Sequence, residues 1–334
     1  MPVYNCQLYI REAVDSILNQ TETNFEFLIL DDASTDQTVS IIKSYTDSRI
    51  KLIVKPQNSG LSNSLNLGLQ LAKGKYIARM DGDDISHPER FSKQITFLEA
   101  NPAVVLCGSW FTLIGSERIV KVPAQHDEIK LAFLKGNSIA HSSVMIRKQS
   151  LDAFTVVYNV SKEPAEDYDL WVRLMLKGKL HNLQEVLLDY RIHGEQVTKR
   201  QISVQKNRVL EIKNSVFNFL ELDLAREEQS VLTKILNNGE GISYADFDIF
   251  KKLQIKLLDS NTRNFFEPVG FKKEILDLEK IVIKHCFFSR PNYLPKTYLE
   301  YLKAKRQLRF KLTIFQEFKL VIKSLTFFKT AANR

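Results

Sequence analysis

Hydrophobic and polar positions in the first two hundred residues alternate between two periods, one typical of buried strands and one of amphipathic helices. Three short apolar runs predict strands at FEFLIL (25–30), KLIVK (51–55) and KYIARM (75–80). Helical spacing follows in segments capped by Ser34 or Thr35, over 61–74 with Gly74 at the end, and from Pro88 to Glu99. This alternation predicts an α/β fold with a Rossmann-like, doubly wound, mostly parallel sheet.

The chain changes character beyond about residue 198, where the strand signals stop. Helical spacing then recurs in segments near 204–223, 225–236, 246–259, 271–285 and 296–328. Net charge changes with it, from −1 over residues 1–200 to +9 over residues 201–334. We therefore expect an α/β domain over 1–198 and a helical, basic region over 199–334.

The end of the chain concentrates the positive charge, since residues 303–334 hold nine basic side chains and one acid, Glu317. One helical stripe would carry Leu308, Leu312, Phe315, Phe318, Ile322 and Leu325. Such a helix can lie on an anionic membrane surface, or it can pack on its own domain with a solvated basic face. We hypothesise peripheral membrane contact. No nucleic-acid module accompanies the charge, so no nucleic-acid partner is expected.

The remaining composition is that of an ordinary globular protein, 44% apolar and 26% charged. The three cysteines are far apart in the sequence, which indicates neither a disulfide framework nor a zinc site. No apolar run approaches the roughly 18 residues of a membrane span, and the first residues lack the features of a secretory signal. A cytoplasmic location is the expectation.

The acidic run DGDD (81–84) follows the third predicted strand directly. Crowded carboxylates repel one another unless a cation lies among them, and oxygen ligands suit Mg²⁺ or Mn²⁺. The alternative for a pattern this short is a polar loop with a helix-capping aspartate. A second acidic strand end, Asp31–Asp32, favours the metal site, because ligands of such sheets bind where strands finish.

Two further acidic sites allow both functional and structural interpretations. Asp32 could accept a hydrogen bond from a base or ribose, or it could belong to an Asx turn. In EDYDLWVR (166–173), a carboxylate near a cleft could be a general base for an acceptor hydroxyl. The same run could equally be an acidic first helical turn, with Trp171 in the core.

Six motifs occur in order: PVYN (2–5), LDDASTD (30–36), NSGLSNSLNLGL (58–69), GKYIARMDGDD (74–84), AEDYDLW (165–171) and YRIH (190–193). Each is weak alone, but together they resemble glycosyltransferase family 2, most closely bacterial members that build surface polysaccharides. The resemblance covers roughly residues 1–198 and implies the GT-A fold. It also implies an inverting, metal-dependent hexosyltransferase. The QxxRW signature of processive members is absent, which favours transfer of a single sugar.

On the donor side, the resemblance implies a nucleotide-sugar site. Its residues would be Pro2, Val3, Tyr4, Asp32, Asn58, Gly60, Asn66, Arg79 and Asp81. Asp32 would bind the base, usually uracil, and Asp81 the ribose or metal. Asp83 would coordinate Mg²⁺ or Mn²⁺ on the diphosphate. His193 would lie near the diphosphate or metal, and a structural histidine is the alternative.

On the acceptor side, the resemblance implies Asp167 as the catalytic base with Glu166 beside it. Trp171 and Arg173 would shape the acceptor site, and His141 and Ser142 would contact the acceptor or serve a structural role. The acceptor would be a glycan or polyprenyl-linked sugar. The enzyme would then work in the cytoplasm, in peripheral contact with the cytoplasmic face of the inner membrane.

Two departures from the family pattern accompany these expectations. The first family strand normally precedes PVYN, so either the true start lies upstream of Met1 or an interior strand is truncated. Many relatives also have an arginine where Leu65 stands, and Arg79 is one candidate for the missing phosphate-binding cation.

Two other functions are compatible with part of the sequence. A haloacid-dehalogenase-type phosphohydrolase would use Asp81 as nucleophile, but it fits Ile85 poorly and leaves the other motifs unexplained. A degenerate transferase that only binds a nucleotide or partner is the more serious alternative. The intact Asp81, Asp83 and Asp167 argue against it.

Overall fold

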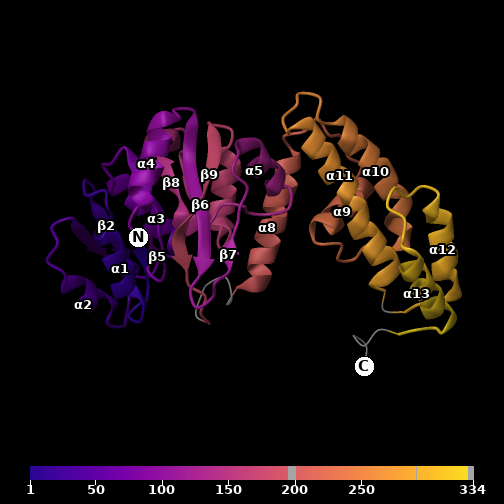
Figure 1. Ribbon diagram of the computed structural model, residues 1–334, viewed down its shortest axis with the longest axis horizontal. Coiled ribbons are helices and arrows are strands. Elements are labelled where there is room, and N and C mark those ends of the chain that lie inside the picture. Colours follow the sequence, from indigo (N-terminus) through magenta and orange to yellow (C-terminus); the bar gives the residue numbers. More distant parts are fainter. Residues whose placement is uncertain (195–200, 291, 330–334) are drawn as a thin grey trace. The chain divides into compact units, whose positions relative to one another are not determined.

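The computed structural model describes residues 1–194, 201–290 and 292–329 (Figure 1). The chain divides into two compact units, Met1–Ile212 and Lys213–Arg334, which are considered separately below. Helix α8 (Ile202–Phe217) runs across this division. The predicted boundary at residue 198 lies outside the described residues.

A three-stranded parallel sheet begins the first unit, in the order β1 (Pro2–Val3), β2 (Phe27–Asp31) and β3 (Ile50–Val54). Helices α1 (Ile10–Leu18), α2 (Thr38–Lys43) and α3 (Leu61–Leu71) connect or follow these strands. The predicted strands are confirmed here. Two predicted helix ends were wrong, because Ser34 and Thr35 bind Asn5 instead of capping α2, and the backbone is already extended at Ala72, before Gly74.

A second, mixed sheet has the order β4-β8-β6-β9-β5, with β7 paired to β6. Its strands are β4 (Tyr76–Ala78), β5 (Ile85–Ser86), β6 (Val104–Leu113), β7 (Ile119–Val120), β8 (Met145–Arg147) and β9 (Lys179–Tyr190). Only β6 and β9 run parallel, so the expected mostly parallel pairing does not hold for this sheet. One antiparallel pair, β6 and β7, is joined by a short turn at Gly115, which needs no helical crossover.

The first unit also contains α4 (Arg90–Ala100), α5 (His126–Phe133) and α6 (Glu166–Leu174), with short turns η1 (His141–Ser143), η2 (Lys148–Leu151) and η3 (Val160–Lys162). A common core joins α1, the first sheet, α4 and β6. Its fully buried members include Ile10, Val14, Ile29, Leu98 and Cys107. The burial of these side chains fixes the positions of β2 and β4 relative to α1 and α4, which pack on the same core.

The start of the chain forms only a two-residue strand. Pro2 and Val3 pair with Leu30 and Asp31, and the amino group of Met1 donates to the carbonyl of Leu28 at 2.9 Å. A mostly apolar cavity of about 590 Å³ adjoins Met1 and is lined by residues of both β2 and β4. The two sheets are therefore separate at this point.

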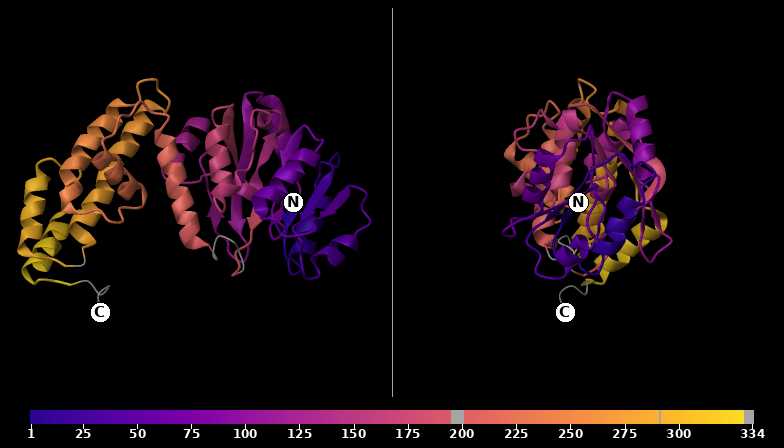
Figure 2. Two further views of the ribbon diagram at one scale, coloured as in Figure 1. Left: turned by 180° about the vertical axis from the view of Figure 1, so that it is seen from behind. Right: turned by 90° about the vertical axis from the view of Figure 1, so that its left-hand side faces the viewer.

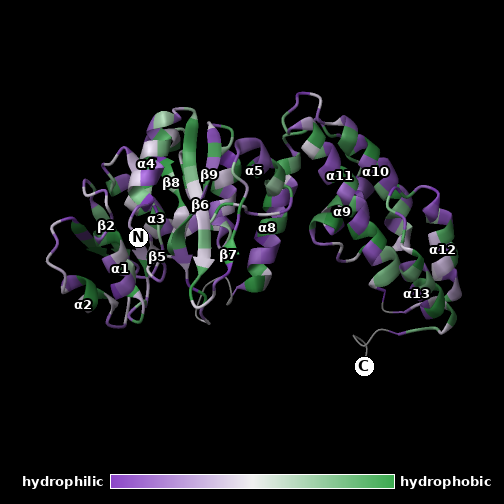
Figure 3. Cartoon of the chain, viewed as in Figure 1, coloured by the Kyte–Doolittle hydropathy of each residue, from purple (hydrophilic) through white to green (hydrophobic). Residues whose placement is uncertain are grey.

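The second unit is helical, as predicted. It contains α9 (Arg226–Leu236), η4 (Tyr244–Asp246), α10 (Phe247–Asp259), α11 (Pro268–Ile283), η5 (Lys284–Phe288), α12 (Pro295–Lys305) and α13 (Ile314–Leu325) (Figure 2). These helices show alternating hydrophobic and hydrophilic bands, as amphipathic helices do (Figure 3). The segment predicted over 296–328 is two helices, because the chain leaves helical geometry between Lys305 and Ile314. Among the described residues, none of the helices is long and apolar enough to cross a bilayer.

Candidate active site

The carboxyl ends of β1 and β2 bring the predicted nucleotide-binding residues together. The backbone N–H of Asp32 donates to the carbonyl of Val3 at 2.9 Å, which fixes the two strand ends side by side. Pro2 and Val3 are buried, whereas Tyr4, directly after them, is exposed. Pro2, Val3, Tyr4 and Asp32 therefore lie together at the ends of these strands, and of the four only Tyr4 is exposed.

Asp32 is held by a network that includes a lysine absent from the sequence-based candidates. One carboxylate oxygen accepts from Lys55 Nζ at 2.6 Å and from the N–H of Ser59 at 3.0 Å. The other accepts from the N–H of Gly60 at 2.9 Å. Gly60 has φ of +92°, which a side chain would disfavour. Since a carboxylate has about four acceptor positions, one remains for a ligand donor.

The other two donor-side candidates of this region differ in their surroundings. Asn58 is exposed. Asn66 instead donates to the carbonyl of Tyr158 at 2.8 Å and accepts from its N–H at 2.9 Å. The side chain of Asn66 thus anchors the backbone at Tyr158. Leu65 is buried, as its apolar character requires.

Asp81, Asp83 and Asp84 each offer a carboxylate oxygen, and these oxygens lie within 4.8 Å of one another. Burial, together with the charges of Asp81 and Asp83, raises the pKa of Asp84 to about 8. Burial and the charge of Asp81 also raise the pKa of Asp83. One oxygen of Asp84 is buried with no hydrogen-bond partner in the described structure. A divalent cation would relieve both the repulsion and this unsatisfied oxygen, so the residues present fit such an ion.

His193 lies beside this acidic triad. Its Nε2 is 2.9 Å from a carboxylate oxygen of Asp83, and its ring lies against that of Tyr9, with centroids 4.9 Å apart. Arg191 donates to the carbonyl of Asp83 at 2.8 Å and, through its backbone, to Asp84 at 2.9 Å. The end of β9 is thereby attached to the triad.

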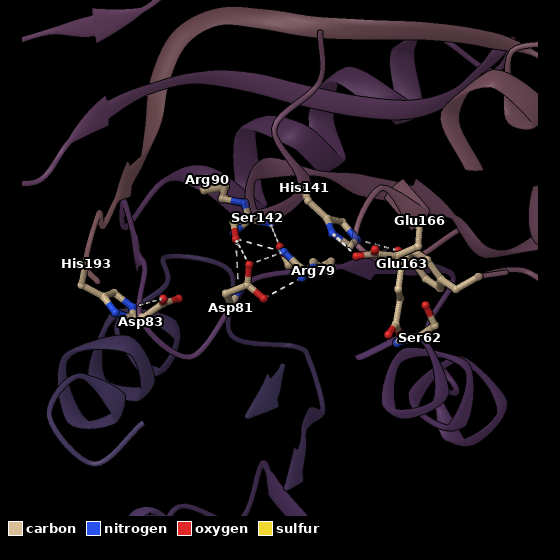
Figure 4. Close-up of polar contacts among 11 residues, drawn as sticks. Ser62, Arg79, Asp81, Asp83, Arg90, His141, Ser142, Glu163, Glu166 and His193 are labelled. Atoms are coloured by element: carbon tan, nitrogen blue, oxygen red, sulfur yellow. Dashed lines mark hydrogen bonds and ion pairs between the residues drawn. The ribbon is translucent and has the colours of Figure 1, made fainter. Parts of the chain in front are cut away.

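Arg79 is buried and is bound to Asp81 by two hydrogen bonds, of 2.7 and 2.6 Å. Ser142 donates to Asp81 at 3.0 Å and accepts from Arg79 at 3.1 Å (Figure 4). The charge of Arg79 is therefore balanced by Asp81 before any phosphate arrives. Ser142, a sequence-based candidate for acceptor contact, belongs to the Asp81 group.

Glu166 and Asp167 begin α6 and differ in ionisation. Burial and the charge of Asp167 raise the pKa of Glu166 to about 8. Burial raises the pKa of Asp167 only to about 6, because the N–H of Tyr168 and the amide of Asn137 donate to it, both at 2.7 Å. At neutral pH, Glu166 therefore holds a proton while Asp167 is charged. Two carboxyl groups with separated pKa values are typical of acid and base assignments.

His141 links the pair to the rest of the site. Its Nε2 is 3.0 Å from the hydroxyl of Tyr158, and its Nδ1 is 3.9 Å from Glu166. Trp171 is fully buried and meets the His141 ring edge-on at 5.7 Å, so Trp171 can affect an acceptor only through His141. Arg173 is bound to Asp169 at 2.9 Å. Because Ser142 and His141 are neighbours in η1, contacts run from Asp81 to Glu166 within one site (Figure 4).

Gln94, which no local sequence pattern singles out, holds η1 in place through hydrogen bonds. Its amide donates to the carbonyls of Cys107 at 2.8 Å and Ser143 at 2.7 Å, and it accepts from Arg90 at 3.2 Å. Gln94→Leu should lower the free energy of unfolding by about 2–4 kcal/mol, since it strands buried polar groups. Urea unfolding measures this, with exposed Gln149→Leu as control. A loss no larger than that of the control would contradict the assigned role.

Comparison with known proteins places this geometry in a family. Residues 1–152 match the family model described as glycosyl transferase family 2. A Haemophilus influenzae protein described as an uncharacterized glycosyltransferase is 37% identical over 224 residues, which span 63% of this chain and 69% of that protein. The amylovoran biosynthesis glycosyltransferase AmsE of Erwinia amylovora is 31% identical over 199 residues, 58% of this chain and 74% of that protein.

Two solved structures share the fold at low sequence identity. Staphylococcus aureus TarS 1-349 in complex with UDP-GlcNAc has a TM-score of 0.58 and 15% identity, covering 86% of this chain and 91% of that one. Mannosyltransferase PcManGT from Pyrobaculum calidifontis, in complex with GDP-Man and Mn²⁺, has a TM-score of 0.51 and 13% identity, covering 86% of both chains. The chain thus has the GT-A fold and belongs to glycosyltransferase family 2, and it is a glycosyltransferase.

Proposed function

We propose that the enzyme transfers one sugar, with inversion, from a nucleoside-diphosphate sugar to a hydroxyl group. A UDP-sugar is the first candidate donor, and a glycan or polyprenyl-linked sugar of surface polysaccharide synthesis is the proposed acceptor. One observation carries the proposal. Next to an acidic triad suited to a divalent ion stands a carboxyl pair in which Asn137 and the N–H of Tyr168 donate hydrogen bonds to Asp167, which favours the ionised form of Asp167 over that of Glu166.

On the donor side, Asp32 would bind the base through its remaining acceptor position, with its carboxylate held in place by the hydrogen bond from Lys55. Asp81, Asp83 and Asp84, with His193 beside them, would hold Mg²⁺ or Mn²⁺. When bound, the ion supplies positive charge that balances the charge developing on the diphosphate leaving group. The neighbours solved with UDP-GlcNAc and with GDP-Man and Mn²⁺ support this assignment.

On the acceptor side, Asp167 would accept the proton of the attacking hydroxyl as that oxygen bonds to the anomeric carbon. The bond to the diphosphate breaks in the same displacement, which inverts the carbon without an enzyme nucleophile. Glu166, protonated at neutral pH, would not compete for the proton. His141 and Arg173 would border the acceptor, with Trp171 packed behind His141.

We expect the side chain of Asn137 to lower the pKa of the proposed base, Asp167. Charged or titratable groups that interact with Asp167 include Glu166, Arg79, Asp81 and Tyr158, and the Asn137 amide stabilises its ionised form. Activity should rise with pH through the pKa of Asp167, near 6. Asn137→Ala removes a donor to the carboxylate and so raises that pKa. The midpoint of the rising limb should move to higher pH, and the rate loss should be larger at pH 6 than at pH 8.

A pH–rate profile checks this, with exposed Asn24→Ala as control. An unshifted midpoint in Asn137→Ala would show that the hydrogen bond does not govern the base.

A panel of nucleotide sugars, assayed with and without Mn²⁺ and a saccharide acceptor, tests the function as a whole. The expected result is metal-dependent turnover of one donor, with an inverted anomer by NMR. UDP binding without turnover of any donor would instead favour a degenerate, binding-only protein. The relative named for amylovoran biosynthesis makes bacterial polysaccharide precursors the first acceptors to try. We place the reaction at the cytoplasmic face of the inner membrane, where polyprenyl-linked acceptors would be held.

A further inference from the structure

Helix α13 (Ile314–Leu325) exposes a row of large apolar side chains within the second unit. They are Ile314, Phe315, Phe318, Ile322 and Leu325, with exposed fractions between 45% and 91%. At about 100° per residue, these five positions fall within about 100° of the helix circumference. We call them the α13 apolar face.

The opposite side of α13 packs against the rest of the second unit. Leu320 and Ser324 are buried, and α13 packs on α12. Glu317 on this side accepts two hydrogen bonds from Lys305 of α12, at 2.7 and 2.9 Å. The apolar face is therefore not needed to hold the unit together. Exposed apolar patches of this kind mark interaction sites.

The stripe of apolar residues predicted from the sequence was wrong at its first two positions. Leu308 is buried and Leu312 half-buried, and both precede the start of α13. Phe315, Phe318, Ile322 and Leu325 share one face as predicted, but that face is turned to solvent.

Positive charge borders the apolar face. Lys319 follows Phe318 and is exposed, and Lys323 lies one turn further on. The ammonium group of Lys323 sits 4.7 Å from the ring centroid of Tyr293 and 4.9 Å from that of Phe328. Glu317, the only acid of residues 303–334, is already bound to Lys305. Within the described residues, no carboxylate forms an ion pair with Lys319 or Lys323.

We propose that the α13 apolar face inserts into the surface of an anionic lipid bilayer, with the exposed Lys319 at the headgroups. A helix with phenylalanine and aliphatic residues on one face and lysines beside them suits that interface. A second copy of the chain fits less well, because a symmetric pairing of this face would bring the exposed Lys319 of each copy towards the other, whereas anionic lipid neutralises that charge. The proposal concerns membrane contact and not sugar transfer, so it stands separately from the proposed reaction.

Co-sedimentation of the full chain with vesicles tests this surface. One vesicle is phosphatidylcholine alone, and the other is phosphatidylcholine mixed with anionic phosphatidylglycerol. We expect binding to the anionic vesicles, weakened at least about tenfold by Phe315→Ser/Phe318→Ser because two apolar anchors are lost. Lys319→Gln should weaken anionic binding about fivefold. Ile255→Ser/Val269→Ser, which changes two exposed apolar residues on α10 and α11, should bind like the wild type.

Three outcomes would overturn the proposal. They are no binding of the wild type to anionic vesicles, equal binding of Phe315→Ser/Phe318→Ser, and equal loss in the α10 and α11 control. A wild-type dimer that the same double variant converts to monomer, without vesicle binding, would assign the face to a second copy instead. Circular dichroism checks that each variant folds, and turnover of a soluble acceptor reports separately on the catalytic site.

Discussion

Asp167→Asn should lower kcat by about 10²- to 10⁴-fold, because the amide cannot accept a proton from the acceptor hydroxyl. The size is that of a lost general base, and the KM for the donor should change little, since the Asp32 end of the site is untouched. Folding should be preserved. The folded protein raises the pKa of Asp167, which means that it disfavours the charged carboxylate relative to a neutral side chain. Replacing the carboxylate with a neutral amide should therefore not destabilise the fold at neutral pH. Initial rates at saturating donor and acceptor measure the effect.

Glu166→Gln is the matched control in the neighbouring position. Because the pKa of Glu166 is raised to about 8, its side chain is neutral at pH 7 and glutamine imitates that form. We expect at most about a tenfold loss of activity, much smaller than for a missing base.

The same variant has a stability signature. A carboxyl whose pKa is higher in the folded than in the unfolded chain stabilises the fold at low pH. That contribution is lost as pH rises from the ordinary value of 4.5 towards 8. Glu166→Gln should therefore gain stability over wild type from pH 5 to pH 8.5. Equal activity losses in Glu166→Gln and Asp167→Asn would contradict the division of roles.

Asp83→Asn should have the second large effect, a loss of about 10²- to 10³-fold in kcat/KM together with weaker Mn²⁺ binding. The triad is crowded with oxygen ligands, and removing one charged oxygen lowers its attraction for a cation. Chelation with EDTA should abolish wild-type turnover, and added Mn²⁺ should restore it.

Calorimetric titration with Mn²⁺ separates this role from a structural one. Asp47→Asn, a change at a half-buried aspartate that is paired with Arg49 and lies outside the triad, should leave both Mn²⁺ affinity and turnover unchanged. Unchanged Mn²⁺ affinity in Asp83→Asn would mean that Asp83 serves only to bind His193, the contact seen at 2.9 Å.

Local sequence patterns predicted the parallel half of the catalytic unit well. β2 is a short apolar run that is mostly buried, and β3 is a short apolar run that is partly buried, so hydrophobicity and length alone indicate both strands. Asp32 and Asp81–Asp84 could be singled out because they follow such strands. The long strands β6 and β9 were not predicted, and the antiparallel pairing of β4 depends on β8, which lies far along the chain.

Three residues of the site were not predicted from the sequence, and the physical reason is the same for each. Lys55, Gln94 and Asn137 act through partners distant in sequence, namely Asp32, Ser143 and Asp167. A lysine closing a strand or an amide in a loop has no local signature that reveals such a partner. The ionisation difference between Glu166 and Asp167 likewise arises from burial and mutual repulsion, which adjacency in the sequence cannot specify.

Crystals grown with Mn²⁺ and UDP, measured at the manganese absorption edge, bear most directly on the central claim. The account predicts one anomalous peak within coordination distance of the carboxylates of Asp81–Asp84 and of the diphosphate, with Asp167 facing the same cavity. A peak held by other residues, or Asp167 turned away from the bound diphosphate, would contradict it.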